Sequence, residues 1–118
     1  MARIIILDDS MASSAFLKMT LTGHRHRVSR TAMVQDVINC PSSSTPDLVL
    51  INQAFGNNSG WKIFNRLKRI SPKIPAMVYV LEPLSAVNAG WIIKAVQTVV
   101  REAKDCDRTG LHGSSVSG

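Results

Sequence analysis

The amino-acid sequence predicts an α/β fold in which helices cover both faces of a parallel sheet. Short apolar, β-branched runs alternate with stretches whose apolar residues recur every three or four positions. Strands and helices that alternate in this way build parallel sheets. The apolar runs also end at polar residues, and in such sheets the functional crevice lies beyond the carboxyl ends of the strands.

The first half of the chain contains two strand–helix units. Residues 3–7 (RIIIL) suit a buried strand, and Ser10 can cap a following helix that should close at Gly23. Residues 24–30 (HRHRVSR) carry too many charges for the middle of a sheet, so we expect an edge strand there. Residues 31–40 have apolar residues at helical spacing, and a proline- and serine-rich loop follows.

The third strand is predicted over residues 47–51 (DLVLI), and it is followed by the turn sequence GNNSG. Residues 61–70 place an apolar stripe on one side of a helix and basic residues off it. A fourth strand is expected over residues 76–81 (AMVYVL).

Composition and length indicate one domain. The chain has 118 residues, 45% of them hydrophobic, which is enough for a single core. We expect a domain over residues 1–104 and a flexible polar tail over residues 105–118. The apolar runs are too short to cross a membrane, and no secretory pattern precedes Asp8, so we expect a cytoplasmic protein without membrane contact.

From residue 3 to about residue 80, and more loosely over residues 88–103, the sequence resembles the receiver domains of bacterial two-component response regulators. The resemblance rests on the acidic pair after the first strand, on PDLVL leading to position 52, on a glycine eight positions later and on the spacing to the fourth strand. It implies a flavodoxin-like, doubly wound sheet with strand order 2-1-3-4-5.

The resemblance also implies a set of site residues. Receiver domains hold a divalent metal with the acidic pair and a third-strand aspartate, which accepts a phosphoryl group. A hydroxyl residue on the fourth strand and a lysine on the fifth respond to it. Here Asp8 and Asp9 match the acidic pair, Asn52 stands at the acceptor position, Val80 stands at the hydroxyl position, and Lys94 fits the lysine.

Two of these positions depart from the family pattern. An amide at Asn52 is a poor nucleophile and carries one negative charge fewer toward Mg²⁺ than a carboxylate. Val80 has the shape of threonine without the hydroxyl. We therefore expect no phosphorylation, no enzymatic activity and no cofactor, with only weak residual metal binding left open at Asp8 and Asp9.

The sequence after the fourth strand allows two interpretations. The favoured one is a shortened receiver, in which the fourth helix is reduced or missing and a fifth strand carries Lys94. The alternative is one long helix over residues 84–104, because apolar residues recur there at spacings of three and four. In the shortened receiver the reduced cover would expose Leu84, Val87 and Trp91, which we therefore take as interface candidates.

These observations predict a phosphorylation-independent pseudo-receiver in bacterial signal transduction or transcription regulation. Its partner would be another protein, a second copy of the chain or further domains of a longer regulator. One alternative is an ordinary phosphoacceptor carrying an inactivating Asn52. Another is an anion or nucleic-acid binding module, suggested by the net charge of +6, although the basic residues form two separated patches, so direct nucleic-acid contact is not expected.

Overall fold

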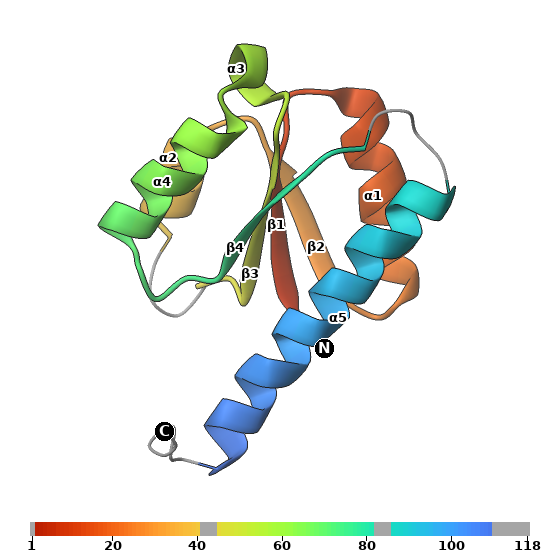
Figure 1. Cartoon of the computed structure of the whole chain (residues 1–118), viewed down its shortest axis with the longest axis vertical. Helices are drawn as coiled ribbons and strands as arrows, with labels where there is room; N and C mark the ends of the chain where they lie inside the picture. The colour runs from red at the N-terminus through yellow and green to blue at the C-terminus, as the bar shows by residue number, and fades with distance from the viewer. Residues whose placement is uncertain (1, 41–44, 82–85, 110–118) are drawn as a thin grey trace.

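The described part of the chain forms a four-stranded parallel sheet in the order β2-β1-β3-β4 (Figure 1). The computed structural model describes residues 2–40, 45–81 and 86–109. The predicted α/β class and the order 2-1-3-4 are confirmed. The strands are β1 (Arg3–Leu7), β2 (Arg27–Thr31), β3 (Leu48–Asn52) and β4 (Ala76–Tyr79).

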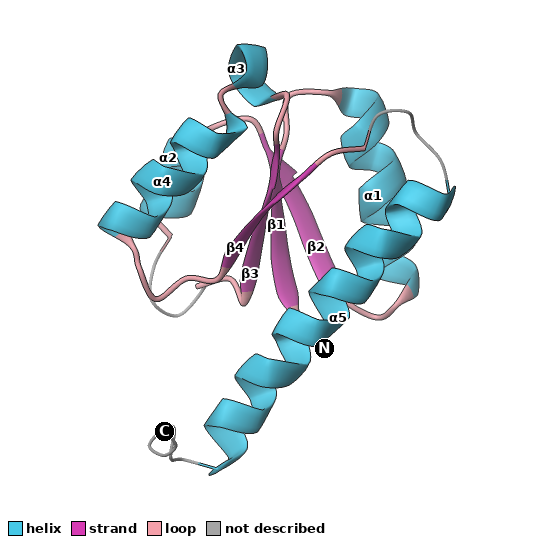
Figure 2. Ribbon diagram, viewed as in Figure 1, coloured by secondary structure: helices cyan, strands magenta, loops and turns pink. Residues whose placement is uncertain are grey.

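Helices lie on both faces of the sheet (Figure 2). Alternate residues of β1 explain why: Ile4 and Ile6 belong to one buried core with α1 and α5, whereas Ile5 and Leu7 belong to a second core with α2 and α4. A strand buried on both faces needs the continuous apolar sequence that residues 3–7 have. The helices are α1 (Met11–Gly23), α2 (Val34–Ile38), α3 (Phe55–Asn58), α4 (Gly60–Ile70) and α5 (Ala86–Thr109).

The helix α1 begins and ends where the sequence predicts. The Ser10 hydroxyl accepts a hydrogen bond from Ser13 N at 3.4 Å, and Ser10 has the extended backbone of an N-cap. The helix ends at Gly23. This fixes the first helix directly beside Asp8 and Asp9.

The predicted fifth strand is wrong, and the long-helix alternative is correct. Residues 86–109 form the single helix α5, and the described residues contain no strand after β4. Between β4 and α5 the structure describes Val80 and Leu81, which are not helical, and residues 82–85 lie outside the described residues. The short apolar run WII fits a strand as well as a helix, but the three-and-four spacing continues to Val100 and decides for the helix.

The helix α5 extends past residue 104, where the sequence predicts the end of the domain, and the domain boundary itself stays a prediction. The helix continues to Thr109, because Gly110 is the first helix-breaking residue after Gly90. The rest of the predicted tail, residues 110–118, lies outside the described residues. Lys94 lies within α5, not on a strand.

Candidate functional site

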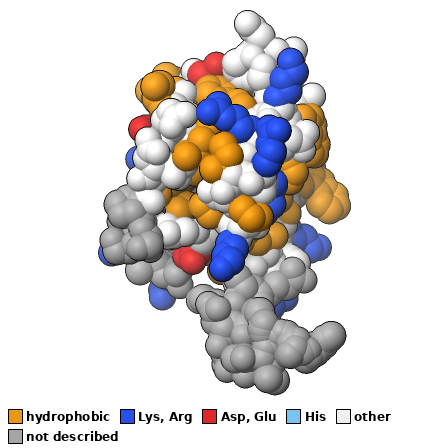
Figure 3. Space-filling view, turned by 90° about the vertical axis from the view of Figure 1, so that its left-hand side faces the viewer, with side chains coloured by type: hydrophobic (Ala, Val, Ile, Leu, Met, Phe, Trp, Pro, Cys, Tyr) orange, Lys and Arg blue, Asp and Glu red, His pale blue; other side chains and the backbone are white. Residues whose placement is uncertain are grey.

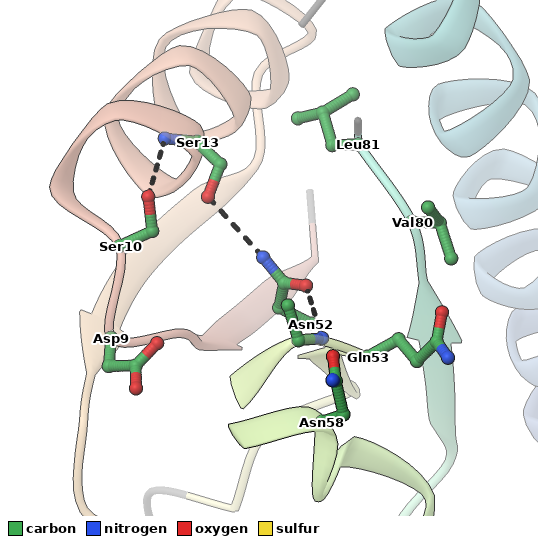
Figure 4. Close-up of a pocket in the computed structure, with 9 residues that line it drawn as sticks. Asp9, Ser10, Ser13, Asn52, Gln53, Asn58, Val80 and Leu81 are labelled. Carbon is green, nitrogen blue, oxygen red and sulfur yellow. Dashed lines mark hydrogen bonds between the residues drawn. The ribbon is translucent and has the colours of Figure 1, made fainter. Parts of the chain in front are cut away.

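Polar side chains gather where the carboxyl ends of the strands meet. A cavity of about 200 Å³ opens there, at the edge that parallel α/β sheets use for ligands. Asn52 lies at its centre, between the N-terminal turn of α1 and the end of β4 (Figure 4). The lining residues are Asp9, Ser10, Ser13, Asn52, Gln53, Ala54, Asn58, Val80 and Leu81.

Asp8 lies beneath this cavity and is fully buried. Its Oδ2 accepts hydrogen bonds from the hydroxyls of Ser13 at 2.6 Å and Tyr79 at 2.7 Å, and from Asn52 Nδ2 at 3.1 Å. Its Oδ1 accepts one from Ser10 N at 2.8 Å. A buried carboxylate is tolerated when donors of this kind replace its water. The carboxylate is therefore held inside a closed network of neutral donors.

The side chain of Asn52 has one orientation that fits this network. Its Nδ2 donates to Asp8, and its Oδ1 accepts from Ala54 N at 2.9 Å. A flipped amide would set Oδ1 against the Asp8 carboxylate and Nδ2 against the Ala54 N–H, and neither contact would be a hydrogen bond. A carboxylate at position 52 would face the same conflict with Asp8. The amide is thus matched to its neighbours.

Tyr79 is a site residue that sequence reasoning missed. It is paired with Asn52 across the β3–β4 ladder and is 3% exposed. Burial, followed by the hydrogen bond to Asp8 and the charge of Asp8, raises the pKa of the Tyr79 hydroxyl above its ordinary range. The hydroxyl therefore stays protonated and remains a donor to Asp8 at physiological pH.

Ser13 was also missed as a site residue. Its hydroxyl donates to Asp8 and lies 3.4 Å from Asn52 Nδ2, from which it accepts. Ser13 lies one turn into α1, where a serine side chain can point back toward the end of β1. Nothing local in the sequence distinguishes it from Ser14, whose hydroxyl instead bonds Ser10 O at 2.7 Å.

Asp9 is exposed and turns away from Asp8 toward α3. Its Oδ2 accepts a hydrogen bond from Gly56 N at 3.1 Å. Gly56, Asn57 and Asn58 all have positive φ, of 57°, 60° and 66°, a conformation that glycine and asparagine tolerate best. The GNNSG sequence was predicted as a turn, and the structure confirms it.

Gly60 is the glycine eight positions beyond Asn52. A Cβ there would lie 2.5 Å from Asn52 O and 2.6 Å from Gln53 Cα. Only glycine permits α4 to start this close to the end of β3. The glycine thus holds the floor of the cavity in place.

The remaining predicted residues lie apart from the buried network. Val80 lines the cavity, as expected for the hydroxyl position, and is 55% exposed. Lys94 is exposed on α5 and does not line the cavity, because the strand that was expected to carry it is absent. Val87 and Trp91 are exposed at 70% and 68%. Leu84 lies outside the described residues.

The residues do not fit the divalent metal that receiver domains hold. Asp8 directs Oδ2 at three donors, and one of them is the Asn52 amide at the position of the family's third carboxylate. Within the described residues no three side chains of His, Cys, Asp or Glu gather closely enough to hold a metal ion. These side chains therefore do not form the carboxylate cluster that a divalent metal needs.

Solved structures similar to this chain include receiver domains of response regulators. A Francisella receiver domain matches with a TM-score of 0.69 at 11% identity, over 87% of this chain and 99% of that chain. A receiver protein from Burkholderia phymatum matches with a TM-score of 0.62 at 15% identity, over 82% and 93%. NtrX from Brucella abortus matches with a TM-score of 0.72 at 15% identity, over 99% of this chain and 31% of that chain.

No protein-family model matches the sequence, and no curated protein is similar to it in sequence. The chain has the fold of the receiver domains, and the identities of these structural matches support the fold alone. In the described part of the chain no helix is both long and apolar enough to cross a membrane.

Proposed function

We propose that this chain is a phosphorylation-independent pseudo-receiver that acts through protein contacts in bacterial signal transduction or transcription regulation. It is not an enzyme and needs no cofactor. The receiver fold supports the signalling context. The distinctive feature is the site, where the acceptor position holds an amide.

The observation that carries this proposal is the hydrogen bond from Asn52 Nδ2 to Asp8 Oδ2 at 3.1 Å. Phosphoryl transfer to position 52 needs a carboxylate nucleophile with a metal ion beside it. Here the position supplies a donor, and Asp8 Oδ2 already accepts three hydrogen bonds. The contacts that would bind Mg²⁺ are used to hold the fold together.

The rival interpretation is an ordinary phosphoacceptor that carries a single inactivating asparagine. Two features beside Asn52 argue against it. Val80 lines the cavity with a side chain that has no hydroxyl. The Tyr79 hydroxyl, at the end of β4, donates a hydrogen bond to Asp8. One substitution would leave the rest of a phosphorylation site intact, whereas this site differs at several positions.

Exposed apolar side chains support a role in protein contacts. Val80, Val87 and Trp91 are each more than half exposed, and apolar side chains gathered on a surface commonly mark interaction sites. On the face made by α2 and α4, hydrophobic side chains also lie between Lys and Arg side chains (Figure 3). The partner is a protein or a second copy of this chain.

The proposal is tested by incubating the protein with acetyl phosphate and Mg²⁺ and measuring its intact mass. We expect no phosphoryl adduct on the native chain. Asn52→Asp should gain an acceptor but lack a responding hydroxyl, so the matched comparison is Asn52→Asp with and without Val80→Thr. An adduct on the native protein overturns the proposal, and a full conformational response of the single variant overturns the argument from Val80.

A further inference from the structure

The free edge of β4 has its hydrogen-bonding groups in position for another strand. Val49 N donates to Pro75 O at 2.9 Å, and Val49 is paired with Ala76. In a parallel ladder alternate residues direct their backbone N–H and C=O groups to each neighbouring strand. Pro75 O faces β3, so the backbone groups of Ala76, Val78 and Val80 face away from β3. Within the described residues no hydrogen bond uses the outward N–H and C=O groups of Ala76, Val78 and Val80.

The two edges of the sheet differ in how they are protected. The β2 edge is charged, with Arg27 and Arg30 in the strand, and charges on an edge discourage pairing with other chains. Residues 76–81 (AMVYVL) contain no charge, proline or glycine. An apolar edge without such protection is a pairing surface.

Trp61 lies on one side of this open edge. It is 55% exposed and stands seven residues before Lys68, which is about two helical turns, so both side chains share one side of α4. The Lys68 ammonium donates to Ile74 O at 2.9 Å, directly before β4. This side of α4 therefore faces β4 and not α2.

Trp91, the other exposed tryptophan, lies on α5 and does not flank this edge. The side of α5 that packs on the sheet carries the buried residues Ala89, Ile92, Val96 and Val100. At about 100° per residue Trp91 points roughly 145° away from that side, and it is 68% exposed. Trp61 is therefore the tryptophan beside the β4 edge.

The half of the sequence that contains β4 is positively charged. From Leu48 to Arg101 the sequence has seven Lys and Arg residues and one acidic residue, Glu82. Two copies of the chain joined at β4 would bring these positive halves together. An acidic strand would be attracted, and charge complementarity of this kind selects partners.

We propose that the β4 edge takes up an extended segment of a partner protein, apolar and acidic in alternation, as a fifth strand of the sheet. The inference rests on the proposed function as a protein-interaction module and specifies its partner. The outward backbone groups of β4 supply the hydrogen bonds, and Trp61 contacts side chains on one face of the added strand. Such strand addition takes affinity from the main chain and specificity from alternate side chains.

The experiment follows the amide and indole NMR signals of the ¹⁵N-labelled protein during titration with short capped peptides. One peptide alternates Val and Glu, and its control alternates Val and Lys. We expect the Val-Glu peptide to shift the signals of Ala76, Val78 and Val80 and the indole of Trp61. Its affinity should exceed that of the Val-Lys peptide and fall with added salt.

A matched pair of variants tests the edge itself. Val78→Pro removes an outward N–H without touching the ladder to β3, and Val28→Pro makes the same change on the β2 edge, where Arg27 N bonds Ala2 O and the N–H of Val28 faces outward. Val78→Pro should weaken Val-Glu peptide binding about tenfold, and Val28→Pro should leave it unchanged. If Val78→Pro fails to fold, Trp61→Glu at an exposed position should weaken the same binding.

Three results would overturn the proposal: peptide shifts absent from β4 or centred on β2, equal binding of both peptides, or equal binding by both proline variants. Light scattering that shows a dimer dissociated by Val78→Pro would assign the edge to a second copy and overturn the acidic partner. All titrations omit phosphodonors, so a failure at the edge leaves the absence of phosphorylation standing. A phosphoryl adduct in the mass assay would leave the edge measurements standing.

Discussion

A single hydrogen-bond donor separates Asn52 from the aspartate of the receiver family. The fully buried Asp8 carboxylate accepts bonds from Ser13, Asn52 and Tyr79 on one oxygen. Removing one partner of a buried charged group leaves it partly unsatisfied, at a cost of about 1–3 kcal/mol or more. The residues that occupy the site are therefore also residues that stabilise the fold.

Tyr79 provides a test of this network. Its pKa is raised, first by burial and then by Asp8, so it stabilises the folded state while protonated. That stabilisation is complete below the ordinary tyrosine pKa of about 10 and is lost as the pH rises beyond it. Because Tyr79 is the single tyrosine of the sequence, tyrosinate absorbance reports on it alone.

We expect the native protein to form tyrosinate only above the ordinary range, together with loss of its circular dichroism signal. The guanidinium-unfolded chain should titrate near 10. Tyr79→Phe should unfold at a higher pH than the native protein, because it has no phenol to ionise. A native protein that titrates near 10 while still folded would contradict the buried hydrogen bond to Asp8.

At this scale the sequence identifies some site residues and misses others for a physical reason. Asp8, Asp9, Asn52 and Val80 stand out because each follows or ends a strand, and the ends of parallel strands meet. Tyr79 reaches Asp8 across 71 positions, and its contact depends on the β3–β4 register. No local pattern contains that register.

The elements follow local signals where those signals are unambiguous. Ser10 caps the start of α1, and the helix ends at Gly23 as predicted, with His24 as its C-cap and positive φ at Arg25. Trp61, in contrast, was expected on the apolar stripe of its helix, yet it is 55% exposed. Helical spacing places it on the side near β4, and the described residues contain no strand beyond β4 to cover that side.

The junction between β3 and α4 gives a prediction at this scale. Gly60→Ala should lower the free energy of unfolding by about 1–3 kcal/mol, because the added Cβ would meet the backbone of Asn52 and Gln53 at 2.5 and 2.6 Å. The matched control is Gly90→Ala on α5, where a Cβ meets nothing within 4 Å. That change should raise stability by roughly 0.5–1 kcal/mol.

Urea unfolding followed by circular dichroism measures both glycine variants. Opposite shifts of the two midpoints are expected. Equal shifts, or a Gly60→Ala protein as stable as the native one, would show that α4 does not need its close approach to β3.

For the whole molecule, the alternation of strands and helices predicts the sheet order up to β4. It fails beyond β4 because a short apolar run fits a strand or a helix equally well. The replacement of the fifth strand by α5 changes the surface: β4 becomes an edge strand, and Lys94 moves out of the site onto an exposed helix. The part of the chain after β3 thus departs from the receiver pattern in two ways: Lys94 lies outside the site, and β4 is exposed as an edge strand.

We expect this protein not to switch on phosphorylation, and NMR of the whole chain with a phosphoryl analogue tests that expectation. Beryllofluoride with Mg²⁺ imitates the phosphoryl group on an aspartate. Added to the ¹⁵N-labelled native protein, it should leave the amide signals of Asp9, Asn52, Tyr79 and Val80 unchanged. Shifts that begin at Asp9 and Asn52 and extend along β4 would show that the protein responds to a phosphoryl analogue, contrary to the proposed function.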